Sequence, residues 1–199
     1  MTKPKLSKLS IADSSRLGYV GSDVRKAIDS RNDDWYTPTE WLHLADRVLK
    51  GIDLDPFSSD SANKRVGAKR YFTINDNAFE QEWKAESVWM NPPYTRGLVA
   101  KAADKFIHEF ELGNFKRGMI LVNNMTDTRW YKRLDDVAAM SSNLTGRIAF
   151  ENGAGQRISG NTRGQTLFLF CSKGRGANYI KKRFSSEVKA KGSNVKVKV

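Results

Sequence analysis

The most regular pattern of hydrophobic and polar positions lies between residues 37 and 51. Its apolar side chains recur at the spacing of one helical face: Trp41, Leu44, Ala45, Val48 and Leu49. Thr37 and Pro38 suit a helix N-cap and first helical position, and Gly51 suits a helix end. The pattern therefore predicts a helix that is capped by the Thr37 side chain and ends before Gly51.

Downstream of this helix, short apolar runs alternate with further helical patterns. Strands are predicted within residues 52–57, 68–73, 87–90, 118–124, 146–150 and 166–170. Helices are predicted over residues 98–112 and within residues 126–134. Strands that alternate with helices are typical of an α/β domain with a largely parallel central sheet flanked by helices.

The pattern divides the chain into three segments. Residues 1–33 mix charged and small polar side chains without sustained periodicity, so a flexible N-terminal arm is expected. The α/β pattern occupies residues 34–172. Residues 173–199 hold nine Lys and Arg residues against the single acid Glu187 and are interpreted as a basic C-terminal tail. Its Lys181, Lys182 and Arg183 are candidates for phosphate contacts, and a solvated tail is the alternative.

Composition narrows the class of partner. The chain has 199 residues, a hydrophobic fraction of 39% and a formal charge of +12, which suits one folded domain with an affinity for polyanions. Nucleic acid is favoured over a membrane surface, and no apolar run approaches the ~20 residues of a membrane span. The single Cys171 cannot form an internal disulfide, and no secretory signal is recognisable, so a reducing, cytoplasmic location is expected.

The candidate chemistry lies at residues 91–94, where Asn91, Pro92, Pro93 and Tyr94 directly follow a predicted strand. Ligands of open α/β sheets bind beyond the carboxyl ends of strands. The prolines stiffen the backbone, so the Asn91 amide oxygen and the Pro92 carbonyl can both face one amino group. Tyr94 can stack on a base flipped out of a duplex, at ~1–3 kcal/mol. A plain chain turn is the alternative.

Asn-Pro-Pro-Tyr resembles the Asp/Asn/Ser-Pro-Pro-aromatic motif of amino-group methyltransferases that use S-adenosylmethionine. Enzymes that modify adenine N6 in DNA share this motif with others that modify protein glutamine or ribosomal RNA guanine. W-Y-T-P at 35–38 and D-L-D-P-F at 53–57 resemble segments of phage-type DNA N6-adenine methyltransferases, and the similarity spans residues 34–171. The resemblance implies a Rossmann-like methyltransferase fold, S-adenosylmethionine as cofactor, double-stranded DNA as partner and, for a phage-encoded chain, the host cytoplasm.

The same resemblance implies a cofactor site. Its candidate residues are Tyr36, Thr37, Pro38, Asp53, Asp55, Pro56, Phe57, Ser58, Asp76 and Phe79. Thr37 and Pro38 would hold the methionine end and Asp55 the ammonium group, whereas Asp53 can instead be structural and Asp76 can instead form a turn. Serines at 58, 59 and 61 stand where most methyltransferases have glycines, which favours the phage-type family over the protein-glutamine enzymes.

The expected reaction is direct transfer of a methyl group to adenine N6, with Asn91 and Pro92 accepting its hydrogens. No metal is expected, since His43 and His108 are the chain's two histidines and no metal-ligand cluster is recognisable. Candidates for guanine or phosphate contacts are Arg96, Arg147, Arg157 and Arg163, each of which can equally be a plain surface residue.

The resemblance further implies GATC as the leading recognition sequence and protection of viral DNA from restriction. The alternatives are a non-catalytic nucleic-acid-binding protein and a methyltransferase of the same motif that acts on RNA or protein glutamine.

Overall fold

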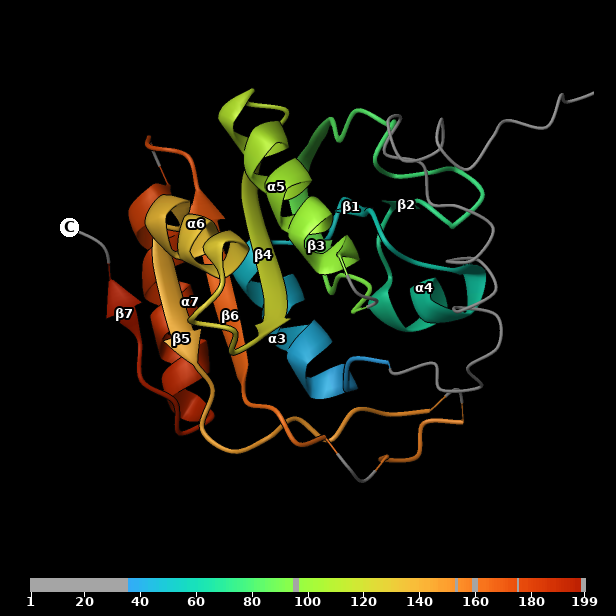
Figure 1. The fold of residues 1–199 in the computed structure, drawn as a ribbon. Helices are drawn as coiled ribbons and strands as arrows, with labels where there is room; N and C mark the ends of the chain where they lie inside the picture. The colour runs from blue at the N-terminus through green and yellow to red at the C-terminus, as the bar shows by residue number, and fades with distance from the viewer. Residues whose placement is uncertain (1–35, 95–96, 153, 159–160, 175, 198–199) are drawn as a thin grey trace, which may run out of the picture. The chain divides into compact units, whose positions relative to one another are not determined.

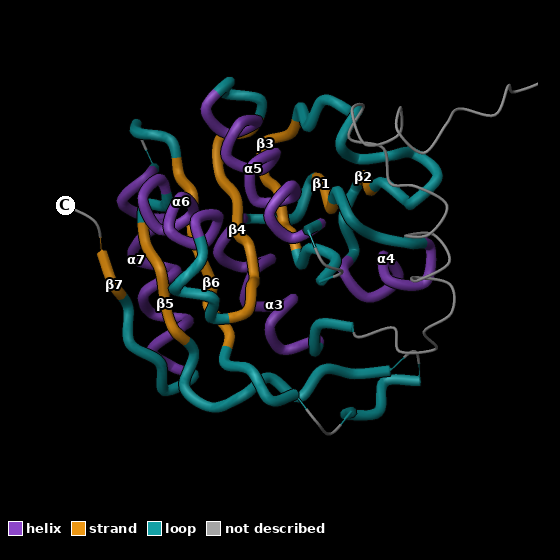
Figure 2. Tube along the Cα trace, in the orientation of Figure 1, coloured by secondary structure: helices purple, strands orange, loops and turns teal. Residues whose placement is uncertain are grey.

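The structure is a computed structural model that describes residues 36–94, 97–152, 154–158, 161–174 and 176–197. The expected N-terminal arm and Arg96 lie outside these residues. The described residues form a seven-stranded sheet with helices on both of its faces (Figures 1 and 2). None of the described helices has the length and apolar character needed to span a membrane.

The helices are α3 (Thr39–Leu49), α4 (Asp60–Val66), α5 (Leu98–Glu111), α6 (Arg129–Val137) and α7 (Ala177–Ala190). The strands are β1 (Leu54–Asp55), β2 (Arg70–Tyr71), β3 (Ala85–Met90), β4 (Phe115–Asn123), β5 (Met140–Asn143), β6 (Gln165–Cys171) and β7 (Lys196–Val197). The helix predicted over residues 98–112 and the strands predicted at 87–90, 118–124 and 166–170 are confirmed as α5, β3, β4 and β6.

The sheet has the strand order β2-β1-β3-β4-β6-β5-β7. Strands β1 to β4 pair in parallel, β6 is antiparallel to both β4 and β5, and β7 is antiparallel to β5. Strands β1 to β5 therefore share one direction, which only β6 and β7 oppose among the described strands. The predicted α/β class with a largely parallel sheet is confirmed.

Alternation along the central strands builds a core on each face of the sheet. In β4, Met119 and Leu121 join one cluster with the buried side chains of α3 and α7. Their neighbours Ile120 and Val122 join the other cluster, with the buried side chains of α5 and α6. Successive strand residues point to opposite faces, so an uninterrupted apolar strand such as β4 serves both layers.

The strand predicted at residues 146–150 is wrong. Ile148 and Phe150 are buried, but their backbone runs outside the sheet, and the Ile148 N–H donates to the Gln165 side chain at 3.1 Å. The fifth strand instead lies at Met140–Asn143, where the polar Met-Ser-Ser-Asn sequence carries no strand pattern. Burial between β6 and β7 outweighs local propensity there.

The predicted cap of the first helix is also wrong. Pro38 is the N-cap residue of α3, and its carbonyl accepts the Trp41 N–H at 2.9 Å. The Thr37 hydroxyl makes no capping bond and is used elsewhere. The helix ends at Leu49, with Lys50 in the left-handed conformation before Gly51.

Residues 173–199, interpreted from sequence as a tail, contribute α7 and β7 to the same compact unit as the rest of the sheet. Ile180, Phe184 and Val188 are buried in the core beneath α7. Lys182 and Lys189 are exposed, so they lie on the outer side of a packed amphipathic helix.

Candidate active site

The site lies where the path of the chain through the sheet reverses. The connection after β1 leads through α4 to β2 on one side, whereas the connection after β3 leads through α5 to β4 on the other. Because β1 and β3 are adjacent and parallel, their carboxyl ends form the switch point at which α/β proteins bind ligands. Asp55 ends β1, and Asn91 directly follows β3.

Asn91 presents an unused hydrogen-bond acceptor in this position. Its Nδ2 group donates to Oγ1 of Thr37 at 3.2 Å, and Thr37 is 6% exposed. Its Oδ1 atom is buried and has no hydrogen-bond partner among the described residues. A buried acceptor without a partner costs free energy, so this oxygen is free to accept a hydrogen bond from outside the described residues.

Tyr94 follows Asn91 by three positions, and the two ends of its side chain have different surroundings. The residue is 40% exposed, yet its hydroxyl points inward and donates to the Leu121 carbonyl of β4 at 3.1 Å. Burial of the hydroxyl raises the pKa of Tyr94 above its ordinary value. Pro92 is buried and Pro93 half-buried, so the exposed ring of Tyr94 follows a packed stretch of backbone directly after β3.

Asp55, at the end of β1, has a buried carboxyl group without a positively charged partner among the described residues. It is 4% exposed, and burial raises its pKa to about 7 although the Phe57 N–H and the Ser58 hydroxyl act in the opposite direction. The Phe57 N–H donates to Oδ1 at 3.2 Å. Ser58 Oγ is close by and buried, but it makes no hydrogen bond of ordinary geometry with a described residue. Within the described part of the chain, no cation pairs with Asp55.

A cluster of aromatic rings includes Phe57, two positions after Asp55. The rings of Phe57 and Phe79 lie 5.2 Å apart, and the Trp83 ring lies edge-on to Phe57 at 5.9 Å. The structure thus brings together Phe57 and Phe79, which were selected from segments 22 residues apart as cofactor contacts. The Phe57 and Phe79 rings are half-buried and tilted by 57° to each other, so they offer an apolar surface against which an aromatic group can pack, whereas Trp83 is fully buried.

Tyr36 lies across the turn that follows β1. Its hydroxyl is 3.0 Å from Ser61 Oγ, and Ser59 caps α4 by accepting the Ala62 N–H at 3.1 Å. The serines found in place of glycines therefore have a structural use, because a serine hydroxyl satisfies a helix N-terminus. Pro38 and Pro56 are both buried.

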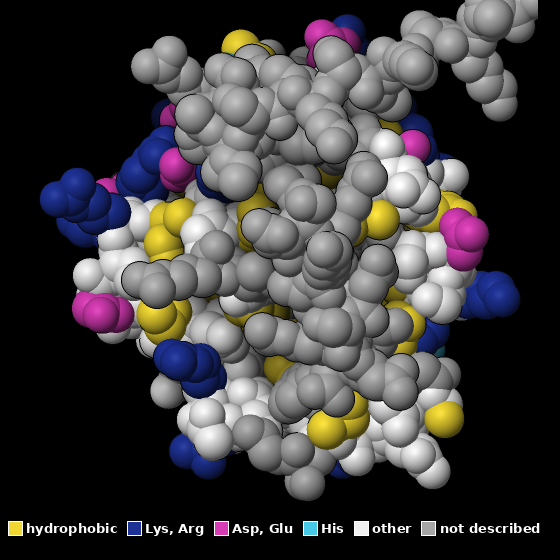
Figure 3. All heavy atoms as spheres, turned by 45° about the vertical axis from the view of Figure 1, so that its right-hand side comes forward, with side chains coloured by type: hydrophobic (Ala, Val, Ile, Leu, Met, Phe, Trp, Pro, Cys, Tyr) yellow, Lys and Arg dark blue, Asp and Glu magenta, His cyan; other side chains and the backbone are white. Residues whose placement is uncertain are grey.

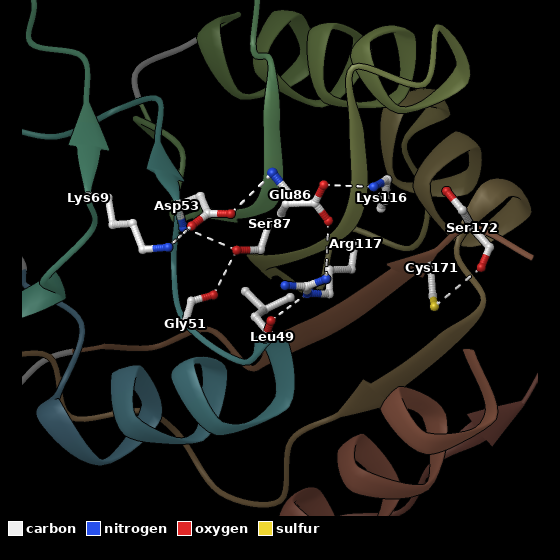
Figure 4. A network of polar contacts seen from close by, with 10 residues as sticks. All are labelled: Leu49, Gly51, Asp53, Lys69, Glu86, Ser87, Lys116, Arg117, Cys171 and Ser172. Atoms are coloured by element: carbon white, nitrogen blue, oxygen red, sulfur yellow. Dashed lines mark hydrogen bonds and ion pairs between the residues drawn. The ribbon is translucent and has the colours of Figure 1, made fainter. Parts of the chain in front are cut away.

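The structure does not bring Asp53 into the site. Its carboxylate binds Lys69 at 2.7 Å and accepts the Glu86 N–H at 3.1 Å, in the network that Figure 4 shows. Burial works against ionisation of Asp53, but these bonds outweigh it and lower the pKa. The network joins the amino ends of β1 and β3, the edge of the sheet opposite Asn91, which favours the structural interpretation.

Asp76 forms a turn. Its Oδ2 atom accepts the N–H and the hydroxyl of Thr73, both at 2.7 Å, and these bonds lower its pKa. Its carboxylate is exposed and already used, so the turn-forming interpretation of Asp76 accounts for its contacts.

Three of the predicted DNA contacts lie at the same edge of the sheet as Asn91. The segment 144–164 joins the carboxyl end of β5 to the start of β6 and carries Arg147, Arg157 and Arg163. Arg163 reaches Met125, just past the end of β4, at 3.4 Å, and Arg157 lies 4.0 Å from Glu40 at the start of α3. All three arginines are exposed.

Lys181, Lys182 and Arg183 lie at the other edge. Strand β6 is antiparallel to β4 and ends at Cys171 opposite Arg117, so α7 begins at the edge away from Asn91. In agreement, Lys50 at the end of α3 lies 4.3 Å from the Tyr179 ring in the first turn of α7. The structure therefore separates these three cations from the switch point.

Sequence reasoning missed a polar network at the edge of the sheet that carries Asn91. The Tyr131 hydroxyl lies 2.7 Å from Thr166 Oγ1, which donates to Asn143 Oδ1 at 2.8 Å. Tyr131 and Asn143 also line a polar cleft of about 610 Å³ between α6 and β5. These side chains come from three separate elements, so no local pattern could have indicated them.

Comparisons with known proteins add to this geometry. The sequence profile of DNA N-6-adenine-methyltransferase (Dam) matches residues 22–194. The DNA N-6-adenine-methyltransferase of Escherichia phage T1 is 27% identical over 170 residues, which are 76% of this chain and 66% of that protein. The protein of the same name from Haemophilus phage HP1 (strain HP1c1) is 30% identical over 146 residues, 71% of this chain and 80% of that protein.

The chain thus spans slightly less than two thirds of the phage T1 protein. Among solved structures, the human methyltransferase 10 domain containing protein aligns over 67% of this chain and 81% of that chain. Its TM-score is 0.38 at 10% identity, a likeness too loose to carry a conclusion. The profile match and the phage HP1 relative are sufficient: this chain belongs to the DNA N-6-adenine-methyltransferase (Dam) family.

Proposed function

We propose that this protein transfers a methyl group from S-adenosylmethionine to N6 of adenine in double-stranded DNA. Membership of the Dam family supports the activity. One observation of this chain carries the proposal further: Oδ1 of Asn91 is buried, unpaired among the described residues, and located at the switch point of the sheet. An amino group that donates hydrogen bonds is the partner this atom lacks.

The residues around Asp55 fit the proposed cofactor. S-adenosylmethionine supplies an electrophilic methyl group on a positively charged sulfur. The unpaired carboxyl of Asp55 would hold its ammonium group, because a buried carboxylate is stabilised by an opposite charge. Phe57 and Phe79 would pack against its adenine ring. Their positions beside the end of β1 support this assignment.

Asn91 and Pro92 would act on the substrate amine. The lone pair of an exocyclic amine is delocalised into the base, which makes the nitrogen a poor nucleophile. Acceptance of its hydrogens by the Asn91 amide oxygen and the Pro92 carbonyl favours the tetrahedral geometry in which that lone pair attacks. The exposed ring of Tyr94 would stack on the flipped base and offset part of its lost stacking in the duplex.

DNA would approach the edge that carries Asn91. On the face shown in Figure 3, the described Lys and Arg side chains are spread among Asp and Glu side chains rather than gathered in one patch. Their position at the same edge as Asn91 favours Arg147, Arg157 and Arg163 over the cations of α7 as DNA contacts. GATC as the recognition sequence and protection of viral DNA from restriction, both implied by the family resemblance, complete the proposal.

The test is methyl transfer from radiolabelled S-adenosylmethionine, with duplex DNA, RNA and protein offered in parallel. Label should enter duplex DNA containing GATC, and Asn91→Ala should lower its rate roughly 10²- to 10³-fold, the cost of removing one transition-state hydrogen bond. Asn75→Ala, in an exposed turn, is the matched control. Label in RNA or protein instead, or none in any substrate, would favour one of the alternatives.

A further inference from the structure

We propose that Thr37 is a positioning residue that makes the Asn91 amide oxygen available to the substrate. The inference rests on the proposed function, and it assigns Thr37 a use other than the helix cap or cofactor contact expected from sequence. The Asn91 Nδ2 to Thr37 Oγ1 bond of 3.2 Å joins residues 54 positions apart, one before α3 and one after β3.

The two ends of an amide are chemically opposite. Oδ1 accepts hydrogen bonds and Nδ2 donates them, whereas an amino substrate needs an acceptor. When Oδ1 faces the substrate, Nδ2 faces the other way and must find an acceptor of its own. Among the described residues, Thr37 Oγ1 is the acceptor that Nδ2 finds. Without it, the productive orientation of Asn91 leaves a part-buried donor unsatisfied, which penalises that orientation.

Thr37 is well supported for this task. On its amino side, Tyr36 forms a β-bridge with Glu151 through bonds of 2.8 and 2.9 Å. On its carboxyl side, Pro38 begins α3 and is buried. Thr37 itself is 6% exposed, and its branched Cβ restricts rotation of the hydroxyl. A hydroxyl held from both sides fixes its partner more firmly than one on a free loop.

The first experiment compares Thr37→Val, which keeps the shape and removes the acceptor, with Thr37→Ser, which keeps the acceptor. Thr37→Val should lower kcat roughly 5- to 100-fold with the Kd for S-adenosylmethionine changed less than about twofold, and Thr37→Ser should retain most of the rate. Thr39→Val, the same change at an exposed position, is the control. A weaker Kd with unchanged kcat would show that Thr37 serves the cofactor instead, and would overturn the proposal.

A double-mutant cycle with Asn91→Ala separates positioning from general damage. Alanine has no amide for Thr37 to hold, so Thr37→Val should cost at least several-fold less in the Asn91→Ala background than in the wild type. Equal costs in both backgrounds would overturn the proposal. If the wild-type chain methylates no DNA, the proposed function fails, whereas full activity in Thr37→Val with an active wild type refutes only the positioning of Asn91.

Discussion

Arg47 of α3 and Glu187 of α7 are joined by two hydrogen bonds, from Nε to Oε1 at 3.0 Å and from Nη2 to Oε2 at 2.8 Å. The hydrogen bond from Arg47 lowers the pKa of Glu187. The arginine is 44% exposed, so the pair contributes at most about 1 kcal/mol to stability. The pair matters for the fold, because it shows that α7 lies along α3.

The core beneath this pair leads to a prediction for stability. Phe184 of α7 is fully buried, so Phe184→Ala should lower the free energy of unfolding by about 3–5 kcal/mol. Tyr179→Ala in the same helix, where the side chain is 50% exposed, should cost less than about 1 kcal/mol. Urea unfolding measures both. Equal midpoints for the two variants would mean that α7 is not packed into the fold.

Asp55 predicts a pH-dependent stability of the ligand-free protein. Burial raises its pKa from 3.8 to about 7, so the neutral form is favoured in the folded state. The neutral Asp55 carboxyl makes its full contribution to the free energy of unfolding below pH ~4. This contribution is lost as the pH rises through about 7, because the carboxyl ionises at a lower pH in the unfolded chain than in the folded protein. Asn cannot ionise, so Asp55→Asn removes the cost of burying a carboxylate and should stabilise the protein by up to ~4 kcal/mol at pH 8.

The same substitution should stabilise less at pH 5 than at pH 8 and should abolish cofactor binding, a trade of function for stability. Denaturant melts at the two pH values and calorimetric titration with S-adenosylmethionine provide the measurements. Asp76→Asn, at an exposed carboxylate whose pKa is lowered, is the control. A uniform effect of Asp55→Asn across this pH range would contradict the buried, unpaired carboxyl.

The ring and the hydroxyl of Tyr94 are predicted to have separate roles. Tyr94→Phe removes the bond to the Leu121 carbonyl and should cost about 1 kcal/mol of folding stability with little change in DNA affinity. Tyr94→Ala also removes the stacking surface and should weaken binding of a flipped base by ~1–3 kcal/mol. A fluorescent adenine analogue at the target position measures flipping directly. If Tyr94→Ala flips the base normally, the ring is not a stacking platform.

The placement of cations at opposite edges of the sheet predicts an asymmetric salt dependence. Arg163→Ala should weaken DNA binding and reduce the slope of log affinity against log salt by about 1, as loss of one phosphate contact does. The double variant Lys181→Ala/Lys182→Ala removes more charge and should leave that slope nearly unchanged, because α7 begins at the other edge. Fluorescence anisotropy at several salt concentrations tests both. The reverse ranking would place DNA on α7.

Local sequence was sufficient for part of the elements and for the position of the Asn-Pro-Pro-Tyr motif after a strand. The helical spacing in residues 98–112 and the apolar runs that became β3, β4 and β6 depend on neighbours within a few positions. The location of Asn91 beyond a strand end followed from the same short-range signals. Much of the sheet, and the position of Asn91 directly after β3, were therefore readable before any contact was known.

Tertiary structure decided which of these features meet. Strand β5 has no pattern of its own and exists because β6 and β7 pair with it. Asp53 and Asp55 are two positions apart, yet Asp53 is held in a network at the amino edge of the sheet, whereas Asp55 lies buried, without a charged partner among the described residues, at the edge that carries Asn91. Thr37 satisfies an amide 54 residues away instead of its own helix. Such partnerships depend on strand order and direction, which periodicity within one segment does not encode.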